Sequence, residues 1–527
     1  MRDGAAPGRS GPVLHHRTER TVLLEAEVLA AFPAEVPIPA AAVAAALAAS
    51  NTETPRVLVV LDDDPTGTQS VADLPVLTRW DIADFTWAFE HISRSGCKPA
   101  VYVLTNTRSL DSAETAARNE EVVRNALAAA GSPKGSIGPR IRLRFVSRSD
   151  STLRGHYPLE PDVIAATVAE VTGEETDGVV LVPAFPDAGR VTIGGVHYMR
   201  GSEGSLIPVA ETEFAKDATF GYTTSDLAHY IEEKSSGRIA ADSVIALDLN
   251  IIRAGASKDG SNAEPAISAK IIANVIDGAF NSTPIVADIV TENDLRALAL
   301  GLEESERRGK KLLYRVGPPF MRARIGQEIR AELTGAEAYA GNRTSEAGGL
   351  IVVGSHTGLT TRQLRALIEQ HSSARIVEID VQQLLAAGEN AESFLNQVVV
   401  SVVDALSGGD VIVHTSRLLI KAGDPTGSLR IARTVSAGVV TVVNRTLRTF
   451  PPRFVIAKGG ITSSDVAVHG LGIRHAVVRG PLLPGLVSLW EPVDGPAKGI
   501  PFIVFAGNVG DDESLAKVTR KLSKEVR

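Results

Sequence analysis

Cysteine is almost missing from this sequence, which has one, Cys97, in 527 residues. A single cysteine excludes an intrachain disulfide and a cysteine-rich metal site, and it is typical of a protein from a reducing cytoplasm. No apolar run approaches the roughly 20 residues of a membrane-spanning helix, so we expect no membrane partner. The net charge is −8 and no basic stripe is present, which argues against a nucleic-acid partner. With 44% apolar and 22% charged residues, the composition is that of an ordinary globular protein.

The chain is too long for one hydrophobic core, and its length predicts two domains. We expect an N-terminal tail and helical extension over 1–55, a first domain over 56–335 and a second domain over 340–527. Residues 1–20 carry four arginines but lack the apolar segment of a secretory signal. We therefore interpret them as a disordered tail, with an organelle transit peptide as the alternative.

A buried strand is expected at residues 57–61, where five apolar residues follow one another. Such a run is typical of a strand covered on both faces in a parallel sheet. Asp62, Asp63 and Asp64 come directly after it, and ligands bind beyond the carboxyl ends of strands in open α/β sheets. Three adjacent carboxylates repel one another unless a cation, a metal or a proton-accepting role offsets the repulsion. We predict a functional site here; the alternative is an acidic surface turn.

The same unit of strand, polar loop and helix then recurs along the first domain. Strands are predicted at 100–104, 142–146 and 178–182, with helices at about 112–130 and 160–171. Strands that alternate with helices predict an α/β fold with a parallel sheet. Because all crossovers have the same hand, the loops after these strands should emerge at one edge of the sheet.

Arginines and carboxylates gather in those loops. Arginine binds a carboxylate with two parallel hydrogen bonds, and aspartate can accept the proton of a hydroxyl. The pattern indicates a small anionic ligand rich in hydroxyls; the alternative is a structural network of ion pairs. The candidate residues at this edge are Asp63, Asp64, Thr66, Gly67, Arg108, Arg148, Asp150, Ser151, Arg154 and Arg190.

Glycine-containing loops follow three predicted strands of the second domain, at 350–353, 454–457 and 502–505. Glycine before a helix lets backbone N–H groups wrap a phosphate, and the helix dipole favours its charge. Neither the P-loop spacing nor the dinucleotide fingerprint is present. The set predicts a nucleotide or polyphosphate site, with ordinary helix caps as the alternative. The candidates are Gly354, Ser355, His356, Thr357, Gly459, Gly460, Thr462, Gly507, Asn508 and Gly510.

Together, and in this order, the motifs resemble those of the four-carbon acid sugar kinases, the group of oxo-tetronate, threonate and erythronate kinases. The resemblance runs from about residue 56 to the C-terminus. The segments that carry it are Asp63-Asp64-Pro65-Thr66-Gly67, Asp150-Ser151-Thr152-Leu153-Arg154-Gly155, Gly189-Arg190 with Thr192 and Gly195, Gly354-Ser355, Gly459-Gly460 with Thr462 and Ser463, and Gly507-Asn508 with Gly510.

The resemblance implies two α/β domains, each with a mostly parallel sheet flanked by helices, and an active site in the cleft between them. It also implies transfer of a phosphoryl group from ATP, with Mg²⁺, to a hydroxyl of a four-carbon sugar acid. Asp63 or Asp64 would accept or orient the hydroxyl proton, and Arg154 would pair with the substrate carboxylate, with Arg148 or Arg190 as further candidates. A homodimer is compatible with the sequence, which does not specify an oligomeric state.

Two other functions stay open. Asp62-x-Asp64-x-Thr66 after an apolar strand also resembles the nucleophile motif of haloacid-dehalogenase-type phosphatases, and Lys458 could imitate a later motif of that family. Such a phosphatase would leave the three glycine loops unexplained. The non-enzymatic alternative is a sensor that binds a sugar acid or a nucleotide without chemistry.

Overall fold

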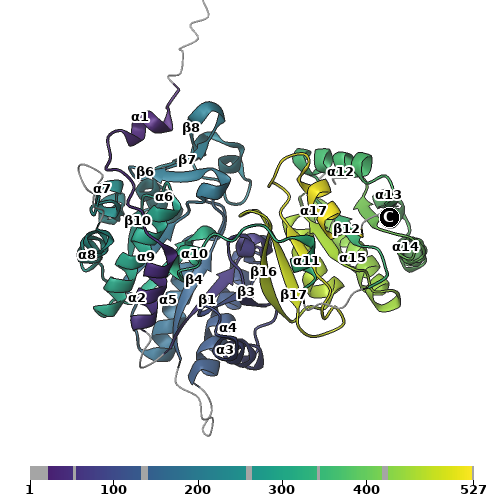
Figure 1. Ribbon diagram of the computed structural model, residues 1–527, viewed down its shortest axis with the longest axis horizontal. Helices are drawn as coiled ribbons and strands as arrows, with labels where there is room; N and C mark the ends of the chain where they lie inside the picture. Colours follow the sequence, from purple (N-terminus) through teal and green to yellow (C-terminus); the bar gives the residue numbers. More distant parts are fainter. Residues whose placement is uncertain are drawn as a thin grey trace, which may run out of the picture.

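Two lobes lie side by side in the computed structural model, which describes residues 22–50, 55–131, 141–256, 264–340, 345–417 and 425–524. The purple-to-teal part of the chain builds the first lobe and the green-to-yellow part builds the second (Figure 1). A single 15-stranded sheet runs through both lobes. The predicted tail over 1–20 lies outside the described residues. Within these ranges, no helix combines the length and apolar character needed to cross a membrane.

Eight strands of the large sheet belong to the first lobe, and all of them are parallel to one another. A separate three-stranded antiparallel sheet lies beside them. In spatial order the eight strands are β2 (Leu74–Leu77), β3 (Ala100–Leu104), β1 (Arg56–Asp62), β4 (Arg142–Arg148), β11 (Leu312–Val316), β5 (Gly178–Val182), β10 (Thr283–Ala287) and β9 (Ile245–Leu247). The small sheet comprises β6 (Arg190–Ile193), β7 (Val196–Arg200) and β8 (Leu206–Pro208).

The side chains of β1 explain why this sheet is covered on both faces. Successive residues of a strand point to opposite faces. Val57, Val59 and Leu61 join one apolar cluster with helices α3 (Ile82–Ser95), α4 (Ser112–Gly131) and α5 (Leu159–Thr172). Leu58 and Val60 join the other, which includes α9 (Glu292–Arg307). The remaining helices of this lobe are α1 (Glu25–Leu29), α2 (Ala40–Ser50), α6 (Leu227–Lys234), α7 (Leu249–Ile252), α8 (Pro265–Ile276) and α10 (Pro319–Arg324).

The second lobe supplies the other seven strands. Five are parallel, and β17 and β16 close the lobe with antiparallel pairing. In spatial order they are β13 (Arg375–Ile379), β14 (Val411–Thr415), β12 (Leu350–Val353), β15 (Val455–Lys458), β18 (Phe502–Phe505), β17 (Val487–Pro492) and β16 (His475–Leu483). The helices are α11 (Gly335–Ala338), α12 (Gly358–Gln370), α13 (Val381–Ala386), α14 (Ala391–Leu406), α15 (Pro425–Thr449), α16 (Gly460–Asp465) and α17 (Ser514–Leu522).

The predicted α/β class with mostly parallel, helix-flanked sheets is confirmed. The strands β2 and β16 pair antiparallel and join the two sheets into one, a connection that no sequence pattern indicated. The central strand β11 was also not predicted. Residues 335–338, at the predicted boundary between the two domains, form the short helix α11.

A buried polar cluster lies at the junction of β2 and β16. The ring nitrogens of His475 lie 2.8 Å from Asp84 Oδ1 and 2.5 Å from Asp494 Oδ2. Trp87 stacks on the His475 ring with centroids 4.2 Å apart. Burial alone would raise the pKa of Asp84, but hydrogen bonds from Arg474 and His475 outweigh it and lower this pKa. Asp84 therefore holds Arg474 and His475 of the second lobe against the first.

We expect Asp84→Asn to lower the free energy of unfolding by about 3 kcal/mol at neutral pH, because it removes the charge of a buried carboxylate that Arg474 and His475 both contact. A carboxyl whose pKa is lowered by folding contributes stability above its ordinary value of 3.8, and this stability is lost as the pH falls through the folded-state pKa. The difference between the two proteins should therefore shrink below about pH 4. Denaturant unfolding across pH measures it.

Glu392→Gln provides the control, because Glu392 forms an exposed pair with Arg445 and should contribute less than about 1 kcal/mol. A loss for Asp84→Asn no larger than that of the control would contradict a stabilising role for the cluster.

Candidate active site

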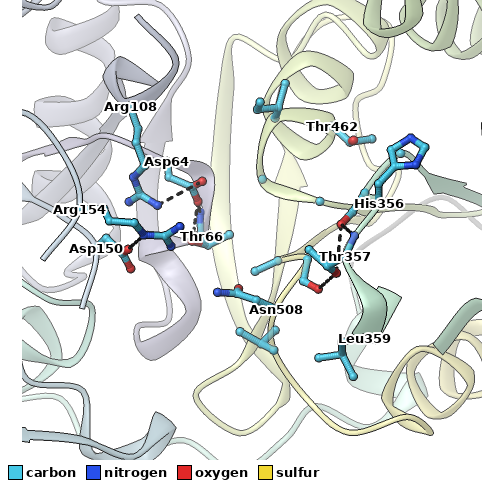
Figure 2. A pocket seen from close by; sticks show the side chains of 18 of the residues that line it. Asp64, Thr66, Arg108, Asp150, Arg154, His356, Thr357, Leu359, Thr462 and Asn508 are labelled. Atoms are coloured by element: carbon cyan, nitrogen blue, oxygen red, sulfur yellow. Dashed lines mark hydrogen bonds and ion pairs between the residues drawn. The ribbon is translucent and has the colours of Figure 1, made fainter. Parts of the chain in front are cut away.

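A cavity of about 1510 Å³ lies between the two lobes. Its walls are the loops at the carboxyl ends of β1, β3, β4 and β5 in the first lobe and of β12, β15 and β18 in the second. Figure 2 shows Asp64, Arg108 and Arg154 on one side, with His356 and Asn508 opposite them. The two edges that the sequence predicted separately therefore share one cavity.

Most of the candidate residues line this cavity. The first lobe contributes candidates of both charges, and the second contributes all three glycine-containing loops. The lining candidates are Asp64, Thr66, Arg108, Arg148, Asp150, Ser151, Arg154, Arg190, Gly354, Ser355, His356, Thr357, Gly459, Gly460, Thr462, Gly507 and Asn508.

Three candidates do not line the cavity, each for a local reason. Asp63 is 1% exposed, because both of its carboxylate oxygens bind Arg108. Gly67 packs against a buried ion pair, since an added Cβ would lie 2.4 Å from Arg148 Nε. Gly510 has φ 83° and turns the chain toward α17. Asp63 and these two glycines therefore shape the loops around the cavity without facing it.

Asp64 is the carboxylate of the triple-aspartate segment that faces the cavity. It precedes the 3-10 turn η1 (Pro65–Ser70), and its Oδ1 accepts hydrogen bonds from Thr66 N at 2.9 Å and Thr66 Oγ1 at 2.5 Å. Its side chain is 17% exposed, and Arg108 Nη1 lies 3.7 Å from Oδ2. Burial raises the pKa of Asp64, but the charges of Arg108 and Arg148 outweigh burial and lower it. Asp64 is therefore ionised at neutral pH.

The second lobe holds the Asp64 turn from the other side. Thr68 Oγ1 accepts a hydrogen bond from Trp490 Nε1 at 2.8 Å and lies 2.9 Å from Ser488 Oγ, both on β17. Gly460, at the start of α16, lies directly against the carboxylate. A Cβ added to Gly460 would be 2.5 Å from Asp64 Oδ2, so a side chain at this position would displace the carboxylate.

Two of the four cavity arginines are neutralised by aspartates beneath the cavity. Arg148, 2% exposed, pairs with Asp62, lies 3.1 Å from Asp63 Oδ1 and donates to the backbone carbonyl of Asp64. Arg108 donates to both oxygens of Asp63, at 3.1 and 2.6 Å. Despite Arg148, burial raises the pKa of Asp62 to about 7. This part of the predicted edge is a structural ion-pair network, the alternative that the sequence left open.

The other two arginines, Arg154 and Arg190, are less completely neutralised by carboxylates. Arg154 Nε donates to Asp150 at 2.6 Å, and Nη1 lies 3.9 Å from Asp217. Arg190 donates from Nη1 to the carbonyl of Ala188 at 2.8 Å, while its buried Nε has no hydrogen-bond partner among the described residues. Burial lowers the pKa of Arg190. Among the described residues Arg190 forms no ion pair, although the charge of Asp150 opposes part of the effect of burial on its pKa.

The glycine loops of the second lobe fit closely together. A Cβ on Gly354 would lie 2.3 Å from Thr462 Oγ1, and one on Gly507 would lie 2.7 Å from Ser355 Oγ. Thr357 caps α12 and donates to the carbonyl of Gly507 at 2.8 Å. β12, β15 and β18 are adjacent and parallel, so the three loops meet at one edge, as their common sequence pattern predicted.

Lys458 lies beneath these loops and is fully buried. Its Nζ donates to the carbonyl of Ala506 at 2.6 Å and lies 3.9 Å from the centre of the Phe505 ring. Burial lowers the pKa of Lys458 to about 7. The next residue, Gly459, has φ 126°, a conformation that a side chain would strain. Lys458 thus joins the loop after β15 to the loop after β18.

Two family models match this chain, one on each lobe. A model described as a sugar-binding N-terminal domain matches residues 58–324, and one described as a nucleotide-binding C-terminal domain matches residues 350–515. The chain belongs to the four-carbon acid sugar kinase family. Within this family, the curated D-erythronate kinase of Heliobacterium modesticaldum is 25% identical over 479 residues, which cover 87% of this chain and 95% of that protein.

Solved structures share the fold of this family member. A protein from Salmonella typhimurium LT2 has a TM-score of 0.61 and 17% identity, covering 88% of this chain and 99% of its own. A Haemophilus influenzae protein has a TM-score of 0.56 and 16% identity, covering 88% of this chain and 100% of its own. At these identities the likeness shows the fold alone.

Several lining residues of this family member were not predicted from the sequence. In the first lobe they include Gln69, Phe185, Met199, Phe214, Asp217 and Pro318. In the second, Ile431, Val435 and Val439 form a stripe on α15, and Leu359 of α12 and Val381 of α13 also line the cavity. Residues spaced four apart share one face of a helix, but the same spacing is typical of a core-facing helix, so no signal marked them as cavity residues.

The described residues form no ready-made cluster of metal ligands in this cavity. Among the described residues, no group of three or more His, Cys, Asp or Glu side chains could hold a metal ion. Mg²⁺ is commonly held by one or two carboxylates together with substrate phosphates, so this observation fits a metal that enters with a nucleotide. The cavity carboxylates nearest the glycine loops are Asp64, against Gly460, and Asp465 on α16.

Asp63 and Asp64 should differ in their effect on stability. We expect Asp63→Asn to lower the free energy of unfolding by about 3–5 kcal/mol, because it removes a buried carboxylate that contacts both Arg108 and Arg148. Asp64→Asn keeps an oxygen that can cap η1 and loses only a partly exposed charge, so it should cost no more than about 1 kcal/mol. Denaturant unfolding of the two variants measures the difference; equal losses would contradict the separate roles of the two carboxylates.

Proposed function

We propose that this family member transfers the γ-phosphoryl group of ATP to a hydroxyl of a four-carbon sugar acid, with Asp64 at the reacting hydroxyl. The main support is the contact between lobes, in which the Asp64 carboxylate lies directly against Gly460 of a glycine loop. A sugar hydroxyl bound at Asp64 would therefore be adjacent to a phosphate bound at Gly459 and Gly460. Phosphoryl transfer depends mainly on such positioning and on charge stabilisation.

In this proposal Asp64 orients the attacking hydroxyl and accepts its proton. Its lowered pKa makes it an ionised acceptor at neutral pH, but a weak base. Phosphoryl transfer proceeds through a loose transition state, so the hydroxyl needs little deprotonation until late in the reaction. The carboxylate is kept in place by Thr66 on one side and Gly460 on the other.

Arg190 is the better candidate to bind the substrate carboxylate, with Arg154 beside it. Arg154 already has Asp150 and Asp217 as partners, whereas the described contacts of Arg190 are to a backbone carbonyl. A buried guanidinium without a counter-charge gains most from an incoming carboxylate. Arg148, also a candidate from the sequence, is committed to Asp62 and Asp63.

The second lobe would bind ATP with its phosphates at the three glycine loops. The apolar stripe of Ile431, Val435 and Val439 on α15 offers a surface for the base. Mg²⁺, held by the phosphates and by Asp64 or Asp465, would neutralise part of their charge. The residues of this chain would orient the phosphates with backbone N–H groups at Gly354, Gly459 and Gly507.

The phosphatase alternative has less support. Its nucleophile would be Asp62, which is 2% exposed, pairs with Arg148 and does not line the cavity. Lys458, its other key residue, is also fully buried. Phosphate release from phospho-esters without ATP would support this alternative. The sensor alternative predicts binding of a sugar acid and a nucleotide without a product.

A turnover assay with ATP, Mg²⁺ and a panel of four-carbon sugar acids tests the proposal. We expect ATP consumption with at least one acid, and Asp64→Asn should lower kcat by roughly 10²–10⁴-fold, the usual contribution of a general base. The nucleotide Kd, measured by calorimetry, should be nearly unchanged. Intact ATP binding without turnover on any acid would contradict the proposal.

Gly460→Ala should separate positioning from nucleotide affinity. Its Cβ would push the Asp64 carboxylate aside, and a misplacement of about 1 Å can lower kcat roughly 100-fold. Gly358→Ala is the matched control, because Gly358 also lines the cavity but its Cβ would have Arg362 Nη1 as nearest neighbour, at 3.8 Å. Equal kcat values for the two variants would argue against the contact between Asp64 and Gly460.

A further inference from the structure

The segment before the family match contacts the sugar-acid side of the molecule. Residues 22–50 precede the matched range, which begins at residue 58. Leu206 N of β8 donates to the carbonyl of Leu23 at 2.8 Å, and Val28, Leu29 and Phe32 pack against a cluster that includes residues of β6 and β7. In Figure 1, α1 lies beside the small sheet of β6, β7 and β8.

An ion pair joins this segment to β7. Both carboxylate oxygens of Glu25 accept hydrogen bonds from Arg200, from Nε and from Nη2, each at 2.7 Å. The pair is largely shielded, with side chains 17% and 30% exposed. Bidentate pairs of this kind fix the orientation of the guanidinium as well as its charge.

Arg200 in turn holds the turn that carries Arg190. Its backbone N donates to the carbonyl of Gly189 at 2.7 Å, and its Nη1 donates to the carbonyl of Pro186 at 3.2 Å. Phe185 and Arg190, at the two ends of this turn, both line the cavity. Met199, the neighbour of Arg200 on β7, pairs with Arg190 in register and also lines the cavity.

We propose that Glu25 is a positioning residue for the sugar acid: through Arg200 it fixes the turn 185–190, so that Arg190 faces the substrate carboxylate. The inference rests on the proposed function. Without Glu25, the Arg200 guanidinium keeps its long hydrogen bonds to the carbonyls of Pro186 and Val290, each 3.2 Å, but loses its two short bonds to a carboxylate, and the turn gains freedom. Among the described residues Arg190 has no ion-pair partner that would fix its position in another way. The loss of Glu25 should therefore weaken the binding of the sugar acid before it affects other parts of the site.

Glu25→Gln in the full-length chain tests the proposal through kinetics. We expect the KM for the sugar acid to rise roughly tenfold, as for the loss of one charge-assisted hydrogen bond, with kcat and the nucleotide KM within about twofold of wild type. If Glu25 acts through Arg190, its effect should shrink in an Arg190→Lys background, since the two changes then affect one element. Fully additive effects, or equal changes in both KM values, would overturn the proposal.

Hydrogen exchange gives a second measurement that does not require turnover. The backbone N–H groups of Ala188, Gly189 and Arg190 donate within the turn, and Glu25→Gln should speed their exchange. Glu170→Gln, which breaks the Arg124–Glu170 pair between α4 and α5, is the control and should leave that exchange unchanged. Unchanged exchange in Glu25→Gln overturns the proposal. A wild-type protein that phosphorylates no sugar acid would instead count against the proposed function, while the exchange experiment still decides this one.

Discussion

One buried guanidinium, that of Arg148, determines the shape of the site. It lies at the end of β4 and contacts the carboxylates of Asp62 and Asp63 and the backbone carbonyl of Asp64. Three adjacent carboxylates would otherwise repel one another at the end of β1. Arg148 pairs with Asp62 and Asp63, and Arg108 pairs with Asp63. Because both carboxylates are paired beneath the cavity, Asp64 is the one that faces it.

The second constraint is the continuity of the sheet. β2 of the first lobe pairs with β16 of the second, and the Asp64 turn is hydrogen-bonded to β17 through Thr68. The catalytic candidate of one lobe therefore depends on strands of the other. In this site a carboxylate and a phosphate loop must lie at van der Waals distance from each other. The continuous sheet keeps them there, since a packed sheet resists small displacements.

The arginines of the cavity wall differ in whether a carboxylate neutralises them. Arg108 and Arg148 have aspartate partners and belong to the structure, whereas Arg190 has backbone partners and is available for a ligand. The sequence placed all four arginines at one edge and favoured Arg154 as the partner of the substrate carboxylate. What distinguishes them in the structure is that Arg148 and Arg108 contact the buried carboxylates of Asp62 and Asp63, whereas Arg190 contacts the carbonyl of Ala188.

The sequence by itself determined the α/β class, the order of most strands along the chain and the two groups of loops, because apolar runs and glycine positions are local patterns. It also brought Asp64, Arg190 and Gly460 forward as candidates. Only the tertiary structure decided that β2 and β16 join the lobes, that Asp63 is buried, that the apolar stripe of α15 faces the cavity and that Glu25 binds Arg200. These are contacts between residues far apart in the chain, and no local pattern of side chains specifies which distant partner a strand end or a charged group will meet.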